Sequence, residues 1–338
     1  MINLPNGVVS VGASAFEGCG SLTSVVLSAS VSNVGSNAFN GCDKVISLVT
    51  SGRVPVKDMF PALVGDLKDI RIASGTTSLC DSALAGCVAL SDVELPSSVS
   101  AIGAFALSGC TGLTQIDVPE GVKSIADGAF CGCENLYSVR MRGHSTSVST
   151  NAFVQCPSVR SIWMPIGAPL KHLFPDSYRQ ISLVKFLEDV TAIPDNAFRD
   201  CVSLSEFDIP ETVFTIGSAA FAGCTEVKEL VMPVALGSIG DNAFRNCTGL
   251  KTVKFMGPQP LANPSIYAGT PKDLWSKVRY AYRESWATND VMLPARWPVP
   301  ESAKDGDFAN TRVSPSWSMY IGSCRTYPRE PAAIVPTF

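Results

Sequence analysis

Residues 95–119 decide the fold, and they read Leu-Pro-Ser-Ser-Val-Ser-Ala-Ile-Gly-Ala-Phe-Ala-Leu-Ser-Gly-Cys-Thr-Gly-Leu-Thr-Gln-Ile-Asp-Val-Pro. Cys110 in this stretch is one of nine cysteines that recur along the chain at a regular interval. They stand at positions 19, 42, 87, 110, 133, 156, 201, 224 and 247, so the intervals are 23 residues or 45, the latter being one unit of 22 plus one of 23. A fixed short period of this kind is the signature of an internal repeat.

The rest of the stretch recurs with the cysteine. The step Ala-Phe-x-x-Cys is repeated along the chain, and a strand pattern persists where the cysteine is missing, at residues 70–72 and 184–186. Eleven units, here called rungs, cover about residues 4 to 257. A five-rung block is repeated at an offset of 114 residues, because even the irregular Met59-Phe60-Pro61 returns as Leu173-Phe174-Pro175.

The period predicts a leucine-rich-repeat solenoid of eleven stacked rungs of about 23 residues, with a parallel sheet on one face and a C-terminal capping segment. A rung of this length cannot bury its own apolar side, so it must stack on its neighbours. The Leu-x-x-Val-x-Leu part alternates with period two and predicts a short strand. The Val-x-x-Ile-Gly part predicts a second wall, and Ala-Phe-x-x-Cys predicts one helical turn with the Phe directed into the core.

Three segments follow from the extent of the repeat. Residues 1–257 are predicted to form the solenoid, 258–299 the C-terminal cap, and 300–338 a linker or extended strand. Within the cap, the amphipathic spacing of residues 271–282 predicts a helix over the last rung.

The repeat resembles the BspA-type leucine-rich repeat of bacterial surface proteins, whose unit reads Leu-x-x-Val-x-Leu-Pro-x-x-Val-x-x-Ile-Gly-x-x-Ala-Phe-x-x-Cys. The resemblance covers about three quarters of the chain, and residues 255–299 are similar to that family's terminal segment. It implies a leucine-rich solenoid that is extracellular or on the cell surface and is used for adhesion or protein binding. The chain shows no signal peptide, which is expected of a fragment or a mature form.

The cysteine column has two interpretations. Stacked rungs would bring Cα atoms to about 4.8 Å, within disulfide range, but parallel side chains keep their Cβ atoms at about the same separation, which is too far to bridge. Buried free thiols that act as small hydrophobes are therefore preferred to a disulfide ladder. No Cys-x-x-Cys pair is present, so no metal site is predicted, and in Cys131-Gly132-Cys133 the two thiols should face opposite ways.

Nothing in the sequence predicts catalysis or a cofactor. The chain has 26 Lys and Arg against 30 Asp and Glu, a formal net charge of −4, which gives no general attraction to nucleic acid. No apolar run is long enough for membrane insertion. Its two histidines, His144 and His172, are interpreted as surface residues, and neither a nucleophile motif nor a phosphate-binding loop is found in context. A non-enzymatic binding or structural protein is predicted.

The outward side chains of the predicted strands supply the candidate site. Opposite charges would be neighbours at Arg71 and Glu94, at Asp117 and Arg140, and at Lys185 and Asp208. Two adjacent rungs stand apart because they combine aromatic side chains with arginines, the residue types enriched at binding hot spots. The predicted partner-binding residues are Tyr137, Arg140, Arg142, Arg160 and Trp163, facing an acidic protein or glycan ligand. The alternative is that Trp163 packs under the irregular residues 165–175 while the arginines only solubilise the face.

Two further expectations concern the ends and the irregular rungs. The first rung has no preceding cap, so self-association through the N-terminal rung, as a structural element of a multi-chain assembly, is the alternative function. The irregular segments 52–66 and 166–180 lack the Phe and Cys pattern and contain prolines, so their amides are expected to exchange faster than those of neighbouring rungs.

Overall fold

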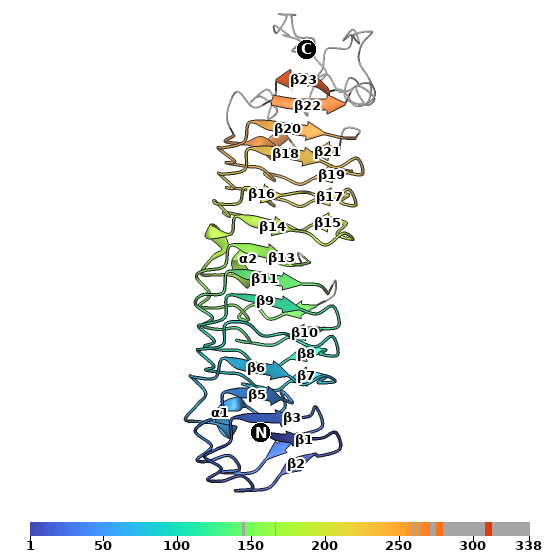
Figure 1. Cartoon of the computed structure of the whole chain (residues 1–338). Helices are drawn as coiled ribbons and strands as arrows, with labels where there is room; N and C mark the ends of the chain where they lie inside the picture. The colour runs from blue at the N-terminus through green and yellow to red at the C-terminus, as the bar shows by residue number, and fades with distance from the viewer. Residues whose placement is uncertain are drawn as a thin grey trace, which may run out of the picture. The chain divides into compact units, whose positions relative to one another are not determined.

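The structure is a computed structural model that describes residues 1–143, 146–165, 167–257, 260–262, 264–270, 275–279 and 308–312. It divides into two compact units. The first consists of Met1–Pro165 with Leu170–Ile181, and the second of Ile166–Pro169 with Ser182–Phe338. Both units are built from the same rung, and the predicted leucine-rich-repeat solenoid of about eleven turns is confirmed (Figure 1).

The front strands of the first unit are together called the front sheet here. They are β1 (Ile2–Leu4), β3 (Ser24–Leu27), β5 (Ser47–Thr50), β6 (Asp69–Ile72), β9 (Gln115–Val118), β11 (Ser138–Met141) and β13 (Ser161–Trp163). They form two parallel ladders, one of β1, β3, β5 and β6 and the other containing β9, β11 and β13. Neighbours pair in parallel at the repeat offset, so that Val139 lies opposite Ile116 and Ile162. The period places another strand at residues 93–95, but these residues do not form one. Val93 and Leu95 are still buried in the core.

The second wall of this unit is a set of two-residue strands, here called the rear strands. They are β2 (Ser10–Val11), β4 (Asn33–Val34), β7 (Ser78–Leu79), β8 (Ala101–Ile102), β10 (Ser124–Ile125) and β12 (Ser147–Val148). In the irregular rungs this wall is replaced by short helical turns. These turns are α1 (Val56–Met59), α2 (Leu170–Leu173) and the 3-10 turn η1 (Tyr178–Gln180).

The second unit repeats the arrangement. Its front strands are β14 (Leu183–Lys185), β16 (Glu206–Phe207), β18 (Glu229–Met232), β20 (Thr252–Phe255) and β22 (Trp275–Arg279). Its other elements are the rear strands β15 (Ala192–Ile193), β17 (Thr215–Ile216), β19 (Ser238–Ile239) and β21 (Leu261–Ala262), the 3-10 turn η2 (Pro264–Tyr267), and β23 (Phe308–Arg312), which pairs antiparallel with β22.

The Ala-Phe-x-x-Cys step is not the helical turn that the spacing predicts. It forms consecutive hydrogen-bonded turns with N–H to carbonyl bonds between residues three apart, as from Asn40 to Asn37 and from Cys42 to Phe39. In the second rung the residue just before the step, Asn37, has a φ of 58°, and Gly41 within the step has a φ of 75°. Asn and Gly are the residues that tolerate this left-handed region best, and it breaks the helical progression.

The core is a stack of inward columns, of which the phenylalanines form the largest. Phe130 stacks on Phe153 with ring centroids 4.9 Å apart, and Phe198 stacks on Phe221 at 4.9 Å. The expectation that the irregular rungs lack this anchor is wrong. Phe60 and Phe174 are buried and lie against Phe39 and Phe153, because α1 and α2 bring the chain back into the column one residue before a proline.

The helix predicted over residues 271–282 is also wrong in the part that the structure describes. Residues Trp275–Arg279 form strand β22, which continues the parallel ladder from β20 with Thr252 opposite Trp275, and β21 extends the rear strands in the same way. The open backbone edge of the preceding rung supplies hydrogen-bond partners at this register, and this outweighs the local helical spacing. The remaining parts of the predicted cap and tail lie outside the described residues.

Candidate binding surface

The five predicted site residues lie together on two adjacent front strands of the first unit. Arg140 is in β11, with Tyr137 just before this strand and Arg142 just after it, while Trp163 ends β13 and Arg160 precedes it. The parallel register places Arg140 opposite Trp163 on one side and opposite Asp117 on the other. Alternation along the strands brings Arg140, Arg142 and Trp163 to the outward face of the sheet. Tyr137 and Arg160 stand before the strands and do not follow this alternation, yet Tyr137 is exposed and Arg160 partly exposed.

Arg140 and Trp163 form the central contact of this surface. The guanidinium carbon of Arg140 lies over the Trp163 ring, 4.0 Å from the ring centroid, which is stacking distance for a cation on an aromatic face. Both side chains are partly exposed. One ring face of Trp163 is therefore covered by a neighbouring front strand, and the contact holds the charged group of Arg140 in a defined place.

Asp117 does not pair with Arg140, contrary to the expectation from their opposed positions. Its carboxylate accepts hydrogen bonds from both Nε and Nη2 of Arg142, the Nε bond being 2.8 Å long. This two-point contact matches the planar fork of an arginine to a carboxylate, and it raises the pKa of Arg142 above its ordinary value. Arg140 is left to stack on Trp163, so the expected pairing of Asp117 with Arg140 is wrong.

Arg160 and Tyr137 complete the surface. Nη1 of Arg160 donates to the carbonyl oxygens of Pro157 and Val159, at 2.9 and 3.0 Å, which ties this side chain to its own strand entry. Tyr137 is 55% exposed. The backbone N–H of Arg160 donates to the Tyr137 carbonyl, so the two residues are direct neighbours across the rungs.

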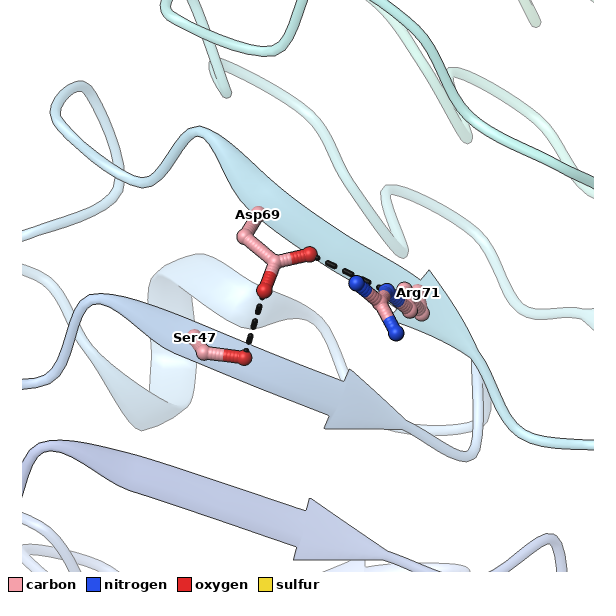
Figure 2. Close-up of polar contacts among 3 residues, drawn as sticks. All are labelled: Ser47, Asp69 and Arg71. Atoms are coloured by element: carbon pink, nitrogen blue, oxygen red, sulfur yellow. Dashed lines mark hydrogen bonds and ion pairs between the residues drawn. The ribbon is translucent and has the colours of Figure 1, made fainter.

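The other expected charge pairs are rearranged or replaced. Arg71 donates from Nε to Asp69 of its own strand at 3.1 Å instead of pairing with Glu94, and Asp69 also accepts the Ser47 hydroxyl at 2.7 Å, as Figure 2 shows. Residues 93–95 form no strand that pairs with β6, so Glu94 is not held opposite Arg71. Lys254 pairs with Glu229 at 2.6 Å, a contact that sequence reasoning missed because Glu229 lies two positions before the outward column in which Lys254 stands.

The front face of the second unit contains a partly open hollow of about 310 Å³. Its lining residues are Leu183, Lys185, Ser205, Glu206, Phe207 and Asp208. The expected pair of Lys185 and Asp208 thus borders the hollow, but no ion pair joins these two described residues. Phe207, which lines the hollow, is partly exposed, and its ring stacks on that of the buried Phe221.

The cysteine column is buried and unbridged among the described residues, with one exception. Cys19 is exposed, so the expectation that all nine column thiols are buried is wrong for the first rung. Elsewhere a thiol donates to a carbonyl of the preceding rung, as from Cys133 to Leu107 at 3.3 Å and from Cys156 to Phe130 at 3.1 Å. Cys131 is partly exposed and Cys133 buried, which confirms that they face opposite ways.

Burial also sets the protonation of these thiols. It raises the pKa to about 12 from an ordinary value of 9.0 for Cys87, Cys110, Cys156, Cys201 and Cys247. A protonated, inaccessible thiol is neither a nucleophile nor a metal ligand. His172 is exposed, as expected, whereas His144 lies outside the described residues. Across the described ranges no cluster of three or more potential metal ligands occurs, and no helix is long and apolar enough to cross a membrane.

These features define a leucine-rich-repeat solenoid with a structured front face. Repeat proteins of this class are typically non-enzymatic. The chain belongs to the family described as BspA type leucine rich repeat region, which matches in six copies over residues 1–56, 57–169 and 171–267. A comparison with curated proteins finds no match.

Solved structures of bacterial leucine-rich repeat proteins are similar to this chain. One from Bacteroides ovatus is 23% identical over 75% of this chain and 86% of its own, with a TM-score of 0.41. A leucine rich cell surface protein from Faecalibacterium prausnitzii is 22% identical over 84% of this chain and 87% of its own, with a TM-score of 0.32. The T. pallidum leucine rich repeat protein is 25% identical over 67% and 76%, with a TM-score of 0.26.

Proposed function

We propose that this protein is a non-enzymatic binding solenoid, displayed at the cell surface or outside the cell, that presents its front face to an acidic protein or glycan. The family supports this role, since its repeat resembles that of bacterial surface proteins used for adhesion. Tyr137, Arg140, Arg142, Arg160 and Trp163 form the centre of the proposed site. The observation that carries the proposal is the stacked pair of Arg140 and Trp163 beside an exposed Tyr137.

The fold itself does not account for the aromatic side chains of this site. The solenoid needs its inward columns, but it does not need large aromatic side chains on the outward face of a sheet. Tryptophan, tyrosine and arginine dominate interface energies because they bury much area and have polar ends that can be satisfied by a partner. A rigid sheet also holds these groups at fixed spacing, which lowers the entropic cost of binding.

The absence of a catalytic role is part of the proposal. The described groups whose pKa is strongly raised are one tyrosine and a set of thiols; all but Cys80 are buried in the core and cannot reach a substrate, and burial and the charge of Asp81 raise the pKa of the partly exposed Cys80 to about 11, so its thiol stays protonated. The hollow beside Lys185 is partly open to solvent, whereas enzymes shift pKa values and exclude water in enclosed pockets.

The test is capture of partners from an extract of cells or secretions that the source bacterium meets. The double variant Trp163→Ala with Arg160→Glu removes one aromatic side chain and reverses one charge, and we expect it to lose the partners that the wild type retains. The matched control is Ile46→Ala with Arg71→Glu, which makes the same kind of change on the same face, where Ile46 is 70% exposed.

Thermal melts must first show that both variants fold like the wild type. Recovery of the same partners by the Trp163 and Arg160 variant would reject this site. Loss of the partners by the control variant as well would show that the whole face contributes, rather than one centre. Sedimentation of the wild type alone would detect self-association, the alternative function.

A further inference from the structure

The three arginines of the proposed site are not equivalent. Arg142 has its fork occupied by Asp117, and Arg160 has Nη1 occupied by two backbone carbonyls. Arg140 contacts the Trp163 ring, and within the described part of the chain its guanidinium has no hydrogen bond or ion pair. It is therefore the arginine of this site whose donors are all open to a ligand.

The contact with Trp163 leaves these donors available. A guanidinium held over an aromatic face by its charge keeps its N–H groups available to a ligand beside the ring. Trp163 thus restrains Arg140 without using any of its hydrogen-bonding capacity. In addition, Asp117, the acid directly opposite Arg140 in the ladder, is engaged by Arg142 and does not compete for it.

We infer that Arg140 binds a carboxylate of the partner through its planar fork, and that the carboxylate belongs to an acidic polypeptide segment. This inference rests on the proposed function and names its ligand chemistry. A carboxylate fits because an arginine fork accommodates both of its oxygens at once. Arg140 and Arg160 carry the charges of the site that no described acid neutralises, which complements an acidic segment.

The same geometry disfavours a sugar ring as the main ligand. Stacking of a pyranose needs an open aromatic face, and the guanidinium of Arg140 already covers one face of Trp163, a residue that is only partly exposed. Tyr137 is the aromatic side chain of the site that remains well exposed. An extended acidic peptide can contact Arg140 and Arg160, which lie on neighbouring strands, without a second stacking platform.

The test is a titration of the full chain with a tetraglutamate peptide blocked at both ends, followed by NMR through the arginine Nε–H and tryptophan indole resonances. We expect the Arg140 and Trp163 signals to shift together. Arg140→Lys keeps the charge but loses the fork and the stacking, so we expect about tenfold weaker binding. Trp163→Ala should weaken binding by about two- to fivefold, because the guanidinium loses its restraint.

The matched control is Arg71→Lys, the same substitution on the same face, which should bind like the wild type. An Arg140 signal that does not move at millimolar peptide, or wild-type affinity of Arg140→Lys, would overturn the inference. So would a uronic acid oligosaccharide that binds as well as the peptide at the same carboxylate concentration. If partner capture is lost in the Trp163 and Arg160 variant but kept in Arg140→Lys, the inference fails while the proposed function stands. If every variant keeps its partners, both fail.

Discussion

Replacing Phe130 by alanine should remove one of the strongest contributions to the stability of the first unit. Its side chain is 0% exposed, and its ring lies parallel to that of Phe153 at 4.9 Å. Truncation of a buried phenylalanine costs about 3–5 kcal/mol, of which a stacked neighbour accounts for about 0.5–1.5 kcal/mol. The free energy of unfolding of an ordinary domain is about 5–15 kcal/mol, so this single substitution should remove a large part of the stability.

The column supplies its own intermediate substitution. Leu84 and Leu107 occupy the same position in two earlier rungs and are fully buried there. Phe130→Leu should therefore cost at most about 1.5 kcal/mol, since the site keeps a large apolar side chain that this column already accepts. The control is Phe105→Ala, one rung earlier, where the side chain is 46% exposed and a loss below about 1 kcal/mol is expected.

The assay is equilibrium urea unfolding combined with amide exchange read by mass spectrometry. Exchange is needed because repeat arrays can unfold in sections, and a single transition would then misreport the loss. We expect Phe130→Ala to expose amides first in its own and the adjacent rungs. The reasoning is refuted if Phe105→Ala is as damaging as Phe130→Ala, or if leucine at position 130 is no better than alanine.

Four further predictions concern the thiols, a glycine and the irregular rungs. Cys110 should resist alkylation at pH 8 by at least about a thousandfold relative to denatured protein, because a pKa of about 12 against 9.0 leaves so little thiolate, and rapid labelling of the native protein would contradict this. Since unfolded thiols ionise first, the free energy of unfolding should fall as the pH rises from about 9 to 12, as alkaline urea titrations can measure. Gly128→Ala should cost about 1–2 kcal/mol in urea unfolding, because its φ is +63° and a Cβ would meet the Phe105 ring at 2.4 Å, and adding Phe105→Ala should recover the steric part, leaving about 1 kcal/mol. Residues 52–66 and 167–180 should exchange amides faster than their neighbours, because their hydrogen bonds are mostly local, and uniform protection along the rungs would refute this.

The inward columns could be predicted from the sequence because stacking makes each rung repeat the demands of the last. A residue such as Val139 or Cys133 meets nearly the same surroundings as its counterpart 23 positions away. The period therefore predicts strand, register and burial together. The same reasoning placed all five candidate residues on two neighbouring strands.

What the sequence did not predict depends on side-chain reach or on a neighbour's backbone. Asp117 can approach either Arg140 or Arg142, and only the position of Trp163 explains why it takes the second. Likewise, the spacing around Trp275 is helical, but the unpaired edge of the preceding rung draws this segment into a strand. Phe60 could be recognised as a core residue only after α1 showed how the irregular rung returns to the column.

In a repeat protein the other rungs show what the fold requires at each position. The outward position of Trp163 is held elsewhere in the first unit by Asp117 and Arg71, and that of Tyr137 by Thr114, so the solenoid folds with small or charged residues in both columns. Aromatic side chains at 137 and 163 are thus not explained by packing of the rung. The proposed partner would account for their stacked and exposed arrangement beside Arg140 and Arg160. The departures from the repeat on its outward face, rather than the repeat itself, are therefore where function should be sought in this chain.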